Sequence, residues 1–221
     1  MNGFGHKRYN EYLCLSKMIN MKAIFLSIGI ALVAATTGFV NEALPIGSKL
    51  PKADVKMLDI SGKKISMAEA AKKNGLLVMF SCNTCPYVVK NEQRTTTISV
   101  FAAKNNVGVI LINSNEAQRG DEDSYEAMKA YAKGLNYNWP YVIDENNVIA
   151  DAFDAKRTPE VFLFDSNMTL VYHGAIDDNP TDEMTVTRQH LREAIKEMVA
   201  GKEVGVKESK SIGCTIKRKK G

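Results

Sequence analysis

The sequence predicts an α/β domain in which a central mixed β-sheet carries helices on both faces. Three continuous apolar runs have the length of buried strands and lie at 76–80, 107–113 and 160–165. Segments with helical patterning separate these runs, and a hairpin and a final helix follow the last one. Strands that alternate with helices along a chain are typical of a sheet that is covered on both sides.

The first half of the pattern is built from short apolar runs separated by turn residues. Ser61 and Gly62 are a turn signal between two extended segments, and LLVMF is an uninterrupted apolar run of buried-strand length. In chain order, the expected elements are a strand at 55–58, an extended segment at 64–66, a helix at 67–73, a strand at 76–80 and a helix that reaches about residue 104.

The second half continues the alternation. The acidic residues 121–123 precede a helical segment, where the positive end of the helix dipole favours negative charge. Ser166 and Asn167 predict a hairpin turn. In chain order, the expected elements are a strand at 107–113, a helix at 124–133, an extended segment at 140–143, one or two helical turns at 148–153, a hairpin of 160–165 with 169–173, and a helix at 188–199.

The composition is that of a globular protein. The chain has 221 residues, of which 45% are hydrophobic and 24% are charged, so one domain or at most two small ones are expected. The net charge of +4 comes from basic segments at both ends, and the body between them is mildly acidic. This distribution argues against a nucleic-acid partner.

The N-terminal region contains an uncharged apolar run at 23–40, directly after Lys22. Val33 and Ala35 stand where a signal peptidase needs small residues, so the run predicts a secretory signal peptide. A retained membrane anchor is the alternative, because 18 residues are just enough to span a bilayer. We therefore expect an exported protein, periplasmic or anchored through 23–40 and facing the periplasm. The expected division is an extension at 1–43, a main domain at 44–205 and a basic tail at 206–221.

The strongest local motif is Cys82-Asn83-Thr84-Cys85-Pro86, between a buried strand and the start of a helix. Two cysteines three residues apart in a first helical turn point the same way, so their sulfurs can join without backbone movement. The unpaired N–H groups there stabilise a thiolate, which is the attacking species in disulfide exchange. The motif predicts Cys82 as the nucleophile and Cys85 as the resolving thiol.

Two other interpretations of the cysteine pair were weighed. Half of a zinc site needs a second pair of ligands, and the remaining candidates are Cys14, Cys214 and three scattered histidines. A purely structural disulfide would close so small a ring that it restricts the unfolded chain very little. Redox chemistry is favoured over both, with neither a metal nor another cofactor.

Thr158-Pro159 precedes the third buried strand. If the peptide bond is cis, the proline can present the backbone beside it to the cysteine pair. A trans proline that merely opens a strand is the alternative. Thr158 and Pro159 are therefore candidate substrate-binding residues.

Six motifs carry a family resemblance and occur in this order: FSCNTCPYV, VILINSN, WPYVIDE, RTPEVFLFD, LVYHGAIDD and SIGCTIK. The similarity as a whole runs from about residue 44 to residue 217. The chain resembles the thioredoxin-like redoxins related to alkyl hydroperoxide reductase and thiol-specific antioxidant (AhpC/TSA) proteins. The resemblance implies a thioredoxin fold, with Cys82 and Cys85 as the redox pair and Pro159 as the cis-proline. It also extends to Asn115, and to Asp177 with Asp178. Relatives commonly have a histidine where this chain has Thr84, and an aromatic residue where it has Arg218.

Three functions stay open on this basis. A vicinal dithiol favours a thiol–disulfide oxidoreductase that exchanges with client proteins and an electron donor. A thiol-dependent peroxidase is the second, although Cys82 occupies the threonine position of the peroxiredoxin pattern and the upstream proline is missing. A binding module whose cysteines only staple a loop is the third.

The remaining candidates lie in the last third of the chain. Cys214 could be a third redox thiol, but the alternation Ile212, Cys214, Ile216 favours an apolar anchor that packs the tail against the body. The acidic residues around Asp177 and Asp178 are expected to form a solvated loop, and His173 is expected to be structural, with no visible partner. The basic residues 217–220 are expected to be solvated, with contact to an anionic membrane as the alternative.

Overall fold

The computed structural model describes residues 44–219, and the structural statements below refer to this part of the chain. The signal peptide or anchor expected within 1–43 lies outside the described residues. Between residues 44 and 219, no helix has the length and apolar character needed to cross a bilayer.

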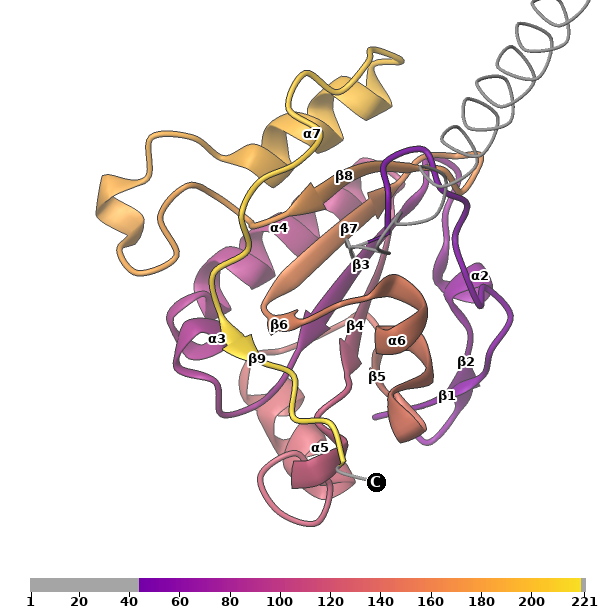
Figure 1. Ribbon diagram of the computed structural model, residues 1–221, viewed down its shortest axis with the longest axis vertical. Helices are drawn as coiled ribbons and strands as arrows, with labels where there is room; N and C mark the ends of the chain where they lie inside the picture. The colour runs from indigo at the N-terminus through magenta and orange to yellow at the C-terminus, as the bar shows by residue number, and fades with distance from the viewer. Residues whose placement is uncertain (1–43, 220–221) are drawn as a thin grey trace, which may run out of the picture. The chain divides into compact units, whose positions relative to one another are not determined.

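The centre of the fold is a seven-stranded mixed β-sheet (Figure 1). β3 (Leu76–Ser81) runs parallel to β4 (Gly108–Asn113) and antiparallel to β7 (Glu160–Phe164). The strand order is β2-β1-β5-β4-β3-β7-β8, with β1 at Met57–Asp59, β2 at Lys64–Ile65, β5 at Tyr141–Ile143 and β8 at Leu170–Gly174. The predicted fold class is confirmed.

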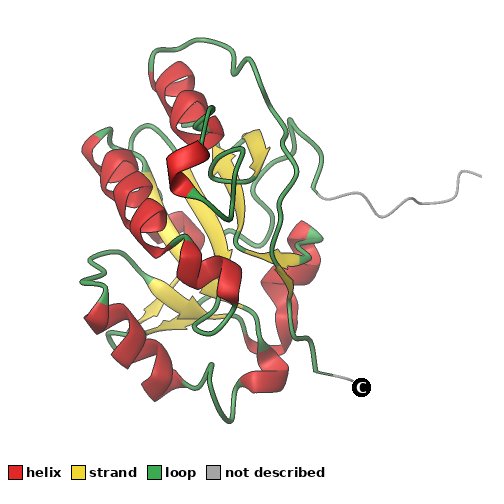
Figure 2. Cartoon of the chain, turned by 90° about the vertical axis from the view of Figure 1, so that its left-hand side faces the viewer, coloured by secondary structure: helices red, strands yellow, loops and turns green. Residues whose placement is uncertain are grey.

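Helices cover both faces of the sheet (Figure 2). α4 (Glu92–Lys104), α5 (Tyr125–Gly134) and α7 (His190–Val199) share one apolar core with the sheet. The short helices α2 (Met67–Ala70) and α6 (Val148–Phe153) share the core on the other face. Alternate residues from Leu76 to Phe80 belong to the two cores, which is why this part of β3 is buried on both faces and reads as one apolar run.

The single long helix expected after β3 is divided in two. α3 (Pro86–Lys90) stops at Asn91, whose backbone is not helical, and α4 begins at the next residue. The Asn91 side chain donates hydrogen bonds to the carbonyl oxygens of Tyr87, at 2.6 Å, and Pro180, at 3.0 Å. Nothing from 87 to 104 is a glycine or proline, so the break has no local sequence signal. Short 3-10 turns lie at Glu116–Gln118, Glu145–Asn147 and Glu183–Thr185.

The C-terminal segment is packed against the domain. The backbone of His173 in β8 bonds to Lys207 and Ser209, at 2.9 and 3.0 Å. Further on, β9 (Cys214–Thr215) pairs antiparallel with β6 (Arg157–Thr158). The expectation of solvated residues from 217 onward is wrong for Arg218, whose side chain bonds to Asp151 and to the Ala155 carbonyl. Figure 1 shows this segment in yellow, crossing the domain.

Candidate active site

The two cysteines lie at the end of β3, but only one of them caps a helix. Cys82 directly follows the strand, and Cys85 is the N-cap of α3, which begins at Pro86. Proline starts the helix there because its missing N–H would have no intrahelical partner at that position. The expectation that both cysteines share the first helical turn is therefore wrong.

Thr158 touches both thiols. Its hydroxyl lies 3.3 Å from the Cys82 sulfur, and its carbonyl oxygen accepts a hydrogen bond from the Cys85 thiol, also at 3.3 Å. The Thr158-Pro159 peptide bond is cis. The two cysteines also pack together in one buried cluster. The structure thus brings together the four residues that the sequence singled out first.

The surroundings of the two thiols separate their pKa values. The interaction with Cys82 lowers the pKa of Cys85, and Cys214 adds to this effect, whereas burial opposes it. The pKa of Cys82 is raised, first by its interaction with Cys85 and then by burial, and the Thr158 hydroxyl opposes the rise. Cys82 as the nucleophile stays a prediction, because the Thr158 hydroxyl lies where it can donate to the Cys82 sulfur and the Cys85 thiol donates to the Thr158 carbonyl oxygen. The directions of the two pKa shifts, and the position of Cys85 at the start of α3, instead favour a thiolate at Cys85.

We expect Cys82→Ala to raise the pKa of Cys85 by about one to two pH units. A hydrogen bond to a charged group contributes about 1.5–3 kcal/mol, and one pH unit corresponds to about 1.4 kcal/mol. The measurement is the pH dependence of Cys85 alkylation by iodoacetamide, read from the Cys85 peptide by mass spectrometry. Cys82→Ser keeps a hydroxyl donor and should show a smaller rise. An unchanged profile in Cys82→Ala would contradict the proposed donor role.

A buried carboxylate, Asp123, organises the loop between the cysteines. Asp123 accepts from the backbone N–H of Asn83 at 2.9 Å, and from the side chains of Asn113 at 2.7 Å and Asn115 at 2.8 Å. Asn115 also accepts the Lys217 N–H at 2.9 Å, so the same network holds the C-terminal segment. The sequence pointed to Asn115 through resemblance alone. It missed Asp123, because an acidic residue before a helix is explained equally well by the helix dipole.

A second buried carboxylate, Glu160, binds the turn that leads into the cis Thr158-Pro159 bond. Glu160 Oε2 accepts the backbone N–H groups of Lys156 and Arg157, at 2.8 and 2.9 Å. Its other oxygen pairs with His173 Nε2 at 2.8 Å, and the His173 ring stacks on Phe162. The expectation that His173 has no partner is therefore wrong. The pairing comes from neighbouring antiparallel strands, whose register the sequence does not show.

Cys214 lies beside the pair. In the β6–β9 ladder Cys214 stands opposite Thr158, and it packs against the cluster that contains Cys82 and Cys85. Gly213 allows this approach, because a Cβ there would come within 2.2 Å of the Thr158 carbonyl oxygen. Of the apolar anchor that the sequence predicted, Ile216 is buried but Ile212 is 40% exposed.

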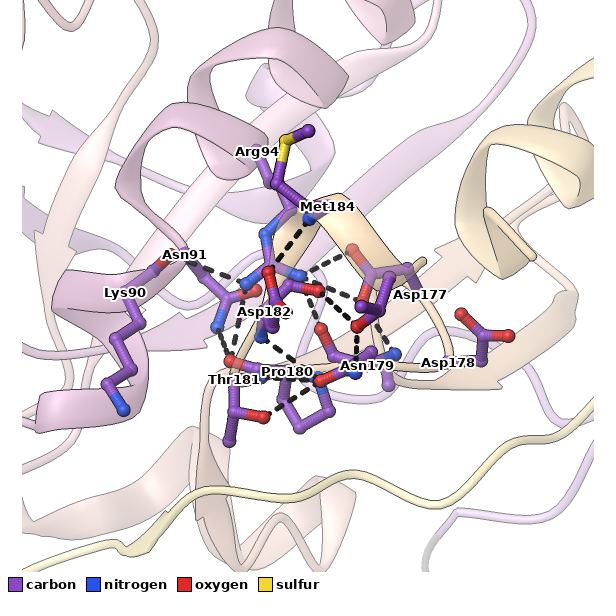
Figure 3. A network of polar contacts seen from close by, with 12 residues as sticks. Lys90, Asn91, Arg94, Asp177, Asp178, Asn179, Pro180, Thr181, Asp182 and Met184 are labelled. Atoms are coloured by element: carbon purple, nitrogen blue, oxygen red, sulfur yellow. Dashed lines mark hydrogen bonds and ion pairs between the residues drawn. The ribbon is translucent and has the colours of Figure 1, made fainter. Parts of the chain in front are cut away.

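Asp177 lies in a buried ion pair with Arg94 of α4, at 2.8 Å (Figure 3). The two side chains are 4% and 7% exposed, so the expectation of a solvated acidic loop is wrong for Asp177. Arg94 also donates to the carbonyl oxygens of Asn179, at 2.7 Å, and Pro180, at 3.2 Å. Asp178 is exposed and bonds to Thr187. Within residues 44–219, no group of three or more His, Cys, Asp or Glu side chains is placed to hold a metal ion.

The fold, with a thiol pair beside a cis-proline, defines a thioredoxin-like protein. The Redoxin family model matches residues 45–191, and the chain belongs to that family. The comparison with curated proteins found no match.

The chain is also similar to several solved structures. An uncharacterized conserved protein from Geobacillus kaustophilus is 33% identical, with a TM-score of 0.74, and 79% of this chain and 93% of that one are covered. A hypothetical protein from Sinorhizobium meliloti 1021 is 35% identical, with a TM-score of 0.74 and coverage of 81% and 98%. The thioredoxin domain of a thiol-disulfide oxidoreductase from Bacteroides vulgatus is 17% identical, with a TM-score of 0.50 and coverage of 60% and 90%, and shows likeness in fold alone.

Proposed function

We propose that this redoxin is a thiol–disulfide oxidoreductase that works through Cys82 and Cys85. The observation that carries the proposal is that the two thiols pack together, with Thr158 in contact with both. A pair in contact can form a disulfide without large movement of the backbone. A cysteine thiolate with a low pKa is both a ready attacking group and a good leaving group in exchange.

The exchange proceeds in two steps. The Cys85 thiolate attacks a client disulfide, a mixed disulfide forms between Cys85 and the client, and one client sulfur leaves as a thiolate. Cys82 then loses its proton and attacks the Cys85 sulfur, which breaks the mixed disulfide and releases the second client sulfur. The client gains two electrons, and the protein holds a Cys82–Cys85 disulfide that an external dithiol must reduce.

A thiol-dependent peroxidase is the second candidate, and the position of Cys85 favours it. A thiolate at a helix start, followed by proline, could attack a peroxide oxygen, become a sulfenic acid and release water or an alcohol. Cys82 would then condense with the sulfenic acid and release water. We rank it second because Cys85 is surrounded by thiols and by the Thr158 carbonyl, a hydrogen-bond acceptor that does not activate a peroxide.

The test is insulin reduction by dithiothreitol, followed as turbidity. The wild-type protein should accelerate the reaction, and Cys85→Ser and Cys82→Ser should each abolish the acceleration. Met184→Ala, which changes an exposed loop side chain, is the control and should behave as wild type. No acceleration by the wild type would contradict the proposal and favour a binding module. Oxidation of the reduced protein by hydrogen peroxide much faster than free cysteine would place the peroxidase first.

We also propose that the exchange takes place outside the cytoplasm, with protein clients and a separate electron donor. The support is the apolar, uncharged run 23–40 after Lys22, which is typical of a signal peptide or an anchor. Disulfide exchange is most useful in an oxidising compartment. Fractionation of cells that express the full chain tests this, and recovery in the cytosol alone would contradict it.

A further inference from the structure

The exchanging thiols are almost sealed from solvent. Cys82 is 1% exposed and Cys85 is 5% exposed, so a client disulfide reaches Cys85 only after part of its cover has moved. Part of the cover is the chain's own C-terminal segment, because β9 lies along β6 with Cys214 opposite Thr158. Cys214 itself is only partly buried. Of these three cysteines, Cys214 is therefore the most exposed.

The three sulfurs are arranged in sequence, with Cys85 in the middle. Cys82, Cys85 and Cys214 pack in one cluster, and both other cysteines shift the pKa of Cys85 downward. The Cys85 thiol donates to the carbonyl oxygen of Thr158 at 3.3 Å, and Thr158 is the ladder partner of Cys214. A Cys85–Cys214 bond would thus join groups that are already neighbours.

Cys214 packs against the cluster of Cys82, Cys85 and Val88, but other contacts hold the C-terminal segment in place. Ile216 is 3% exposed and supplies the apolar anchor of the segment. Backbone bonds from Ile216 to the Lys156 carbonyl, at 3.0 Å, and from Lys217 to Asn115, at 2.9 Å, hold the strand in place. These contacts place residue 214 against the pair without any contribution from its thiol.

We propose that Cys214 is a third redox thiol, which moves the disulfide from the buried pair to the surface. The inference rests on the proposed thiol–disulfide exchange. After a client has been reduced, Cys214 loses its proton and its thiolate attacks the Cys85 sulfur of the Cys82–Cys85 disulfide. The Cys85–Cys214 bond forms, the Cys82–Cys85 bond breaks, and Cys82 leaves as a thiolate that takes up a proton. No electrons are gained or lost in this step.

The relay makes the oxidised protein accessible to its reductant. A dithiol attacks the partly exposed Cys214 sulfur, and Cys85 leaves as a thiolate. The second thiol of the reductant then releases Cys214, and the reductant keeps the disulfide. The protein returns to three thiols, and Cys82 never has to face solvent.

The first test is disulfide mapping in two matched variants, each of which keeps Cys214 and one cysteine of the pair. Both carry Cys14→Ser, so that no fourth thiol interferes. After treatment with stoichiometric diamide, Cys82→Ser should form an intramolecular Cys85–Cys214 disulfide at least about tenfold faster than Cys85→Ser forms Cys82–Cys214, because only the first pair is in contact. Equal rates, or no Cys85–Cys214 linkage, would overturn the proposal. Cys82→Ala serves the same purpose if the serine variant does not fold.

The second test separates this inference from the proposed function. The wild type with insulin shows whether exchange occurs at all. For the relay, the Cys82–Cys85 disulfide of Cys214→Ser is mixed with dithiothreitol, and its reduction should be several-fold slower than in the wild type. An active wild type together with an unchanged rate in Cys214→Ser would remove the relay and leave the exchange function standing.

Discussion

We expect Asp177→Ala to lower the free energy of unfolding by about 3–5 kcal/mol, because it leaves the buried Arg94 guanidinium without its counter-charge. Arg94 Nη1 lies 2.9 and 2.8 Å from the two carboxylate oxygens of Asp177, and both side chains are almost fully buried. The remaining partners of Arg94 are carbonyl oxygens, which carry no full negative charge. Urea denaturation at neutral pH measures the loss.

Two comparisons make this expectation specific. Glu193→Ala breaks the Arg188–Glu193 pair, whose side chains are 44% and 42% exposed, and should cost no more than about 1 kcal/mol. The double variant Arg94→Met with Asp177→Leu removes both charges and should cost less than Asp177→Ala alone. A loss in Asp177→Ala no larger than that of Glu193→Ala would contradict the role given to the buried pair.

The ion pair also matters for the position of the active site. Arg94 and Asn91 together bind the carbonyl oxygens of Asn179 and Pro180, and both lie where α3 gives way to α4 (Figure 3). α3 carries Cys85 at its N-cap. The loop around Asp177 therefore binds the C-terminal end of α3, and Cys85 lies at the N-terminal end of the same helix.

The sequence predicts well the features that depend on local pattern. Buried strands read as apolar runs because both faces of the sheet are covered, and this is how β3, β4 and β7 were expected close to their observed places. The motif around Cys82 and the Thr158-Pro159 dipeptide identify themselves by residue type. That they meet within 3.3 Å follows from β3 and β7 being neighbours in the sheet.

The features missed by the sequence depend on partners far apart in the chain. Arg94 and Asp177 are 83 positions apart, and each looks like an ordinary surface charge when it is read alone. Asp123 and Asn83 are 40 positions apart, and the sequence does not show their hydrogen bond either. The part of the C-terminal segment around Ser209 is held by backbone bonds and by the Ser209 hydroxyl, which leave no hydrophobic period to recognise. The sequence therefore predicted the two thiols of the pair, but not the distant side chains that surround them.

Glu160→Leu should lower the free energy of unfolding by about 3–5 kcal/mol. The substitution leaves the N–H groups of Lys156 and Arg157 and one nitrogen of His173 without their acceptor, and each unsatisfied buried group costs about 1–3 kcal/mol. The turn at 156–157 leads directly into β6 and the cis Thr158-Pro159 bond. Urea denaturation measures the loss, and Glu160→Gln, which keeps an acceptor oxygen, should lose less.

The pH dependence of stability tests the negative charge of Glu160, because Glu160→Gln removes the charge and keeps nearly the same side-chain shape. Burial raises the pKa of Glu160, but the hydrogen bonds from His173 and from the two backbone N–H groups outweigh it, so the pKa is lowered overall. A carboxyl group with a lowered folded-state pKa stabilises the fold above its unfolded pKa of about 4.3, and this stabilisation is lost as the pH falls through the folded value. The wild type should therefore lose more stability than Glu160→Gln between neutral pH and pH values below about 4, because glutamine binds no proton and the other carboxylates are common to both proteins. Parallel losses in the two proteins would show that Glu160 is not held as a buried anion below the cis-proline.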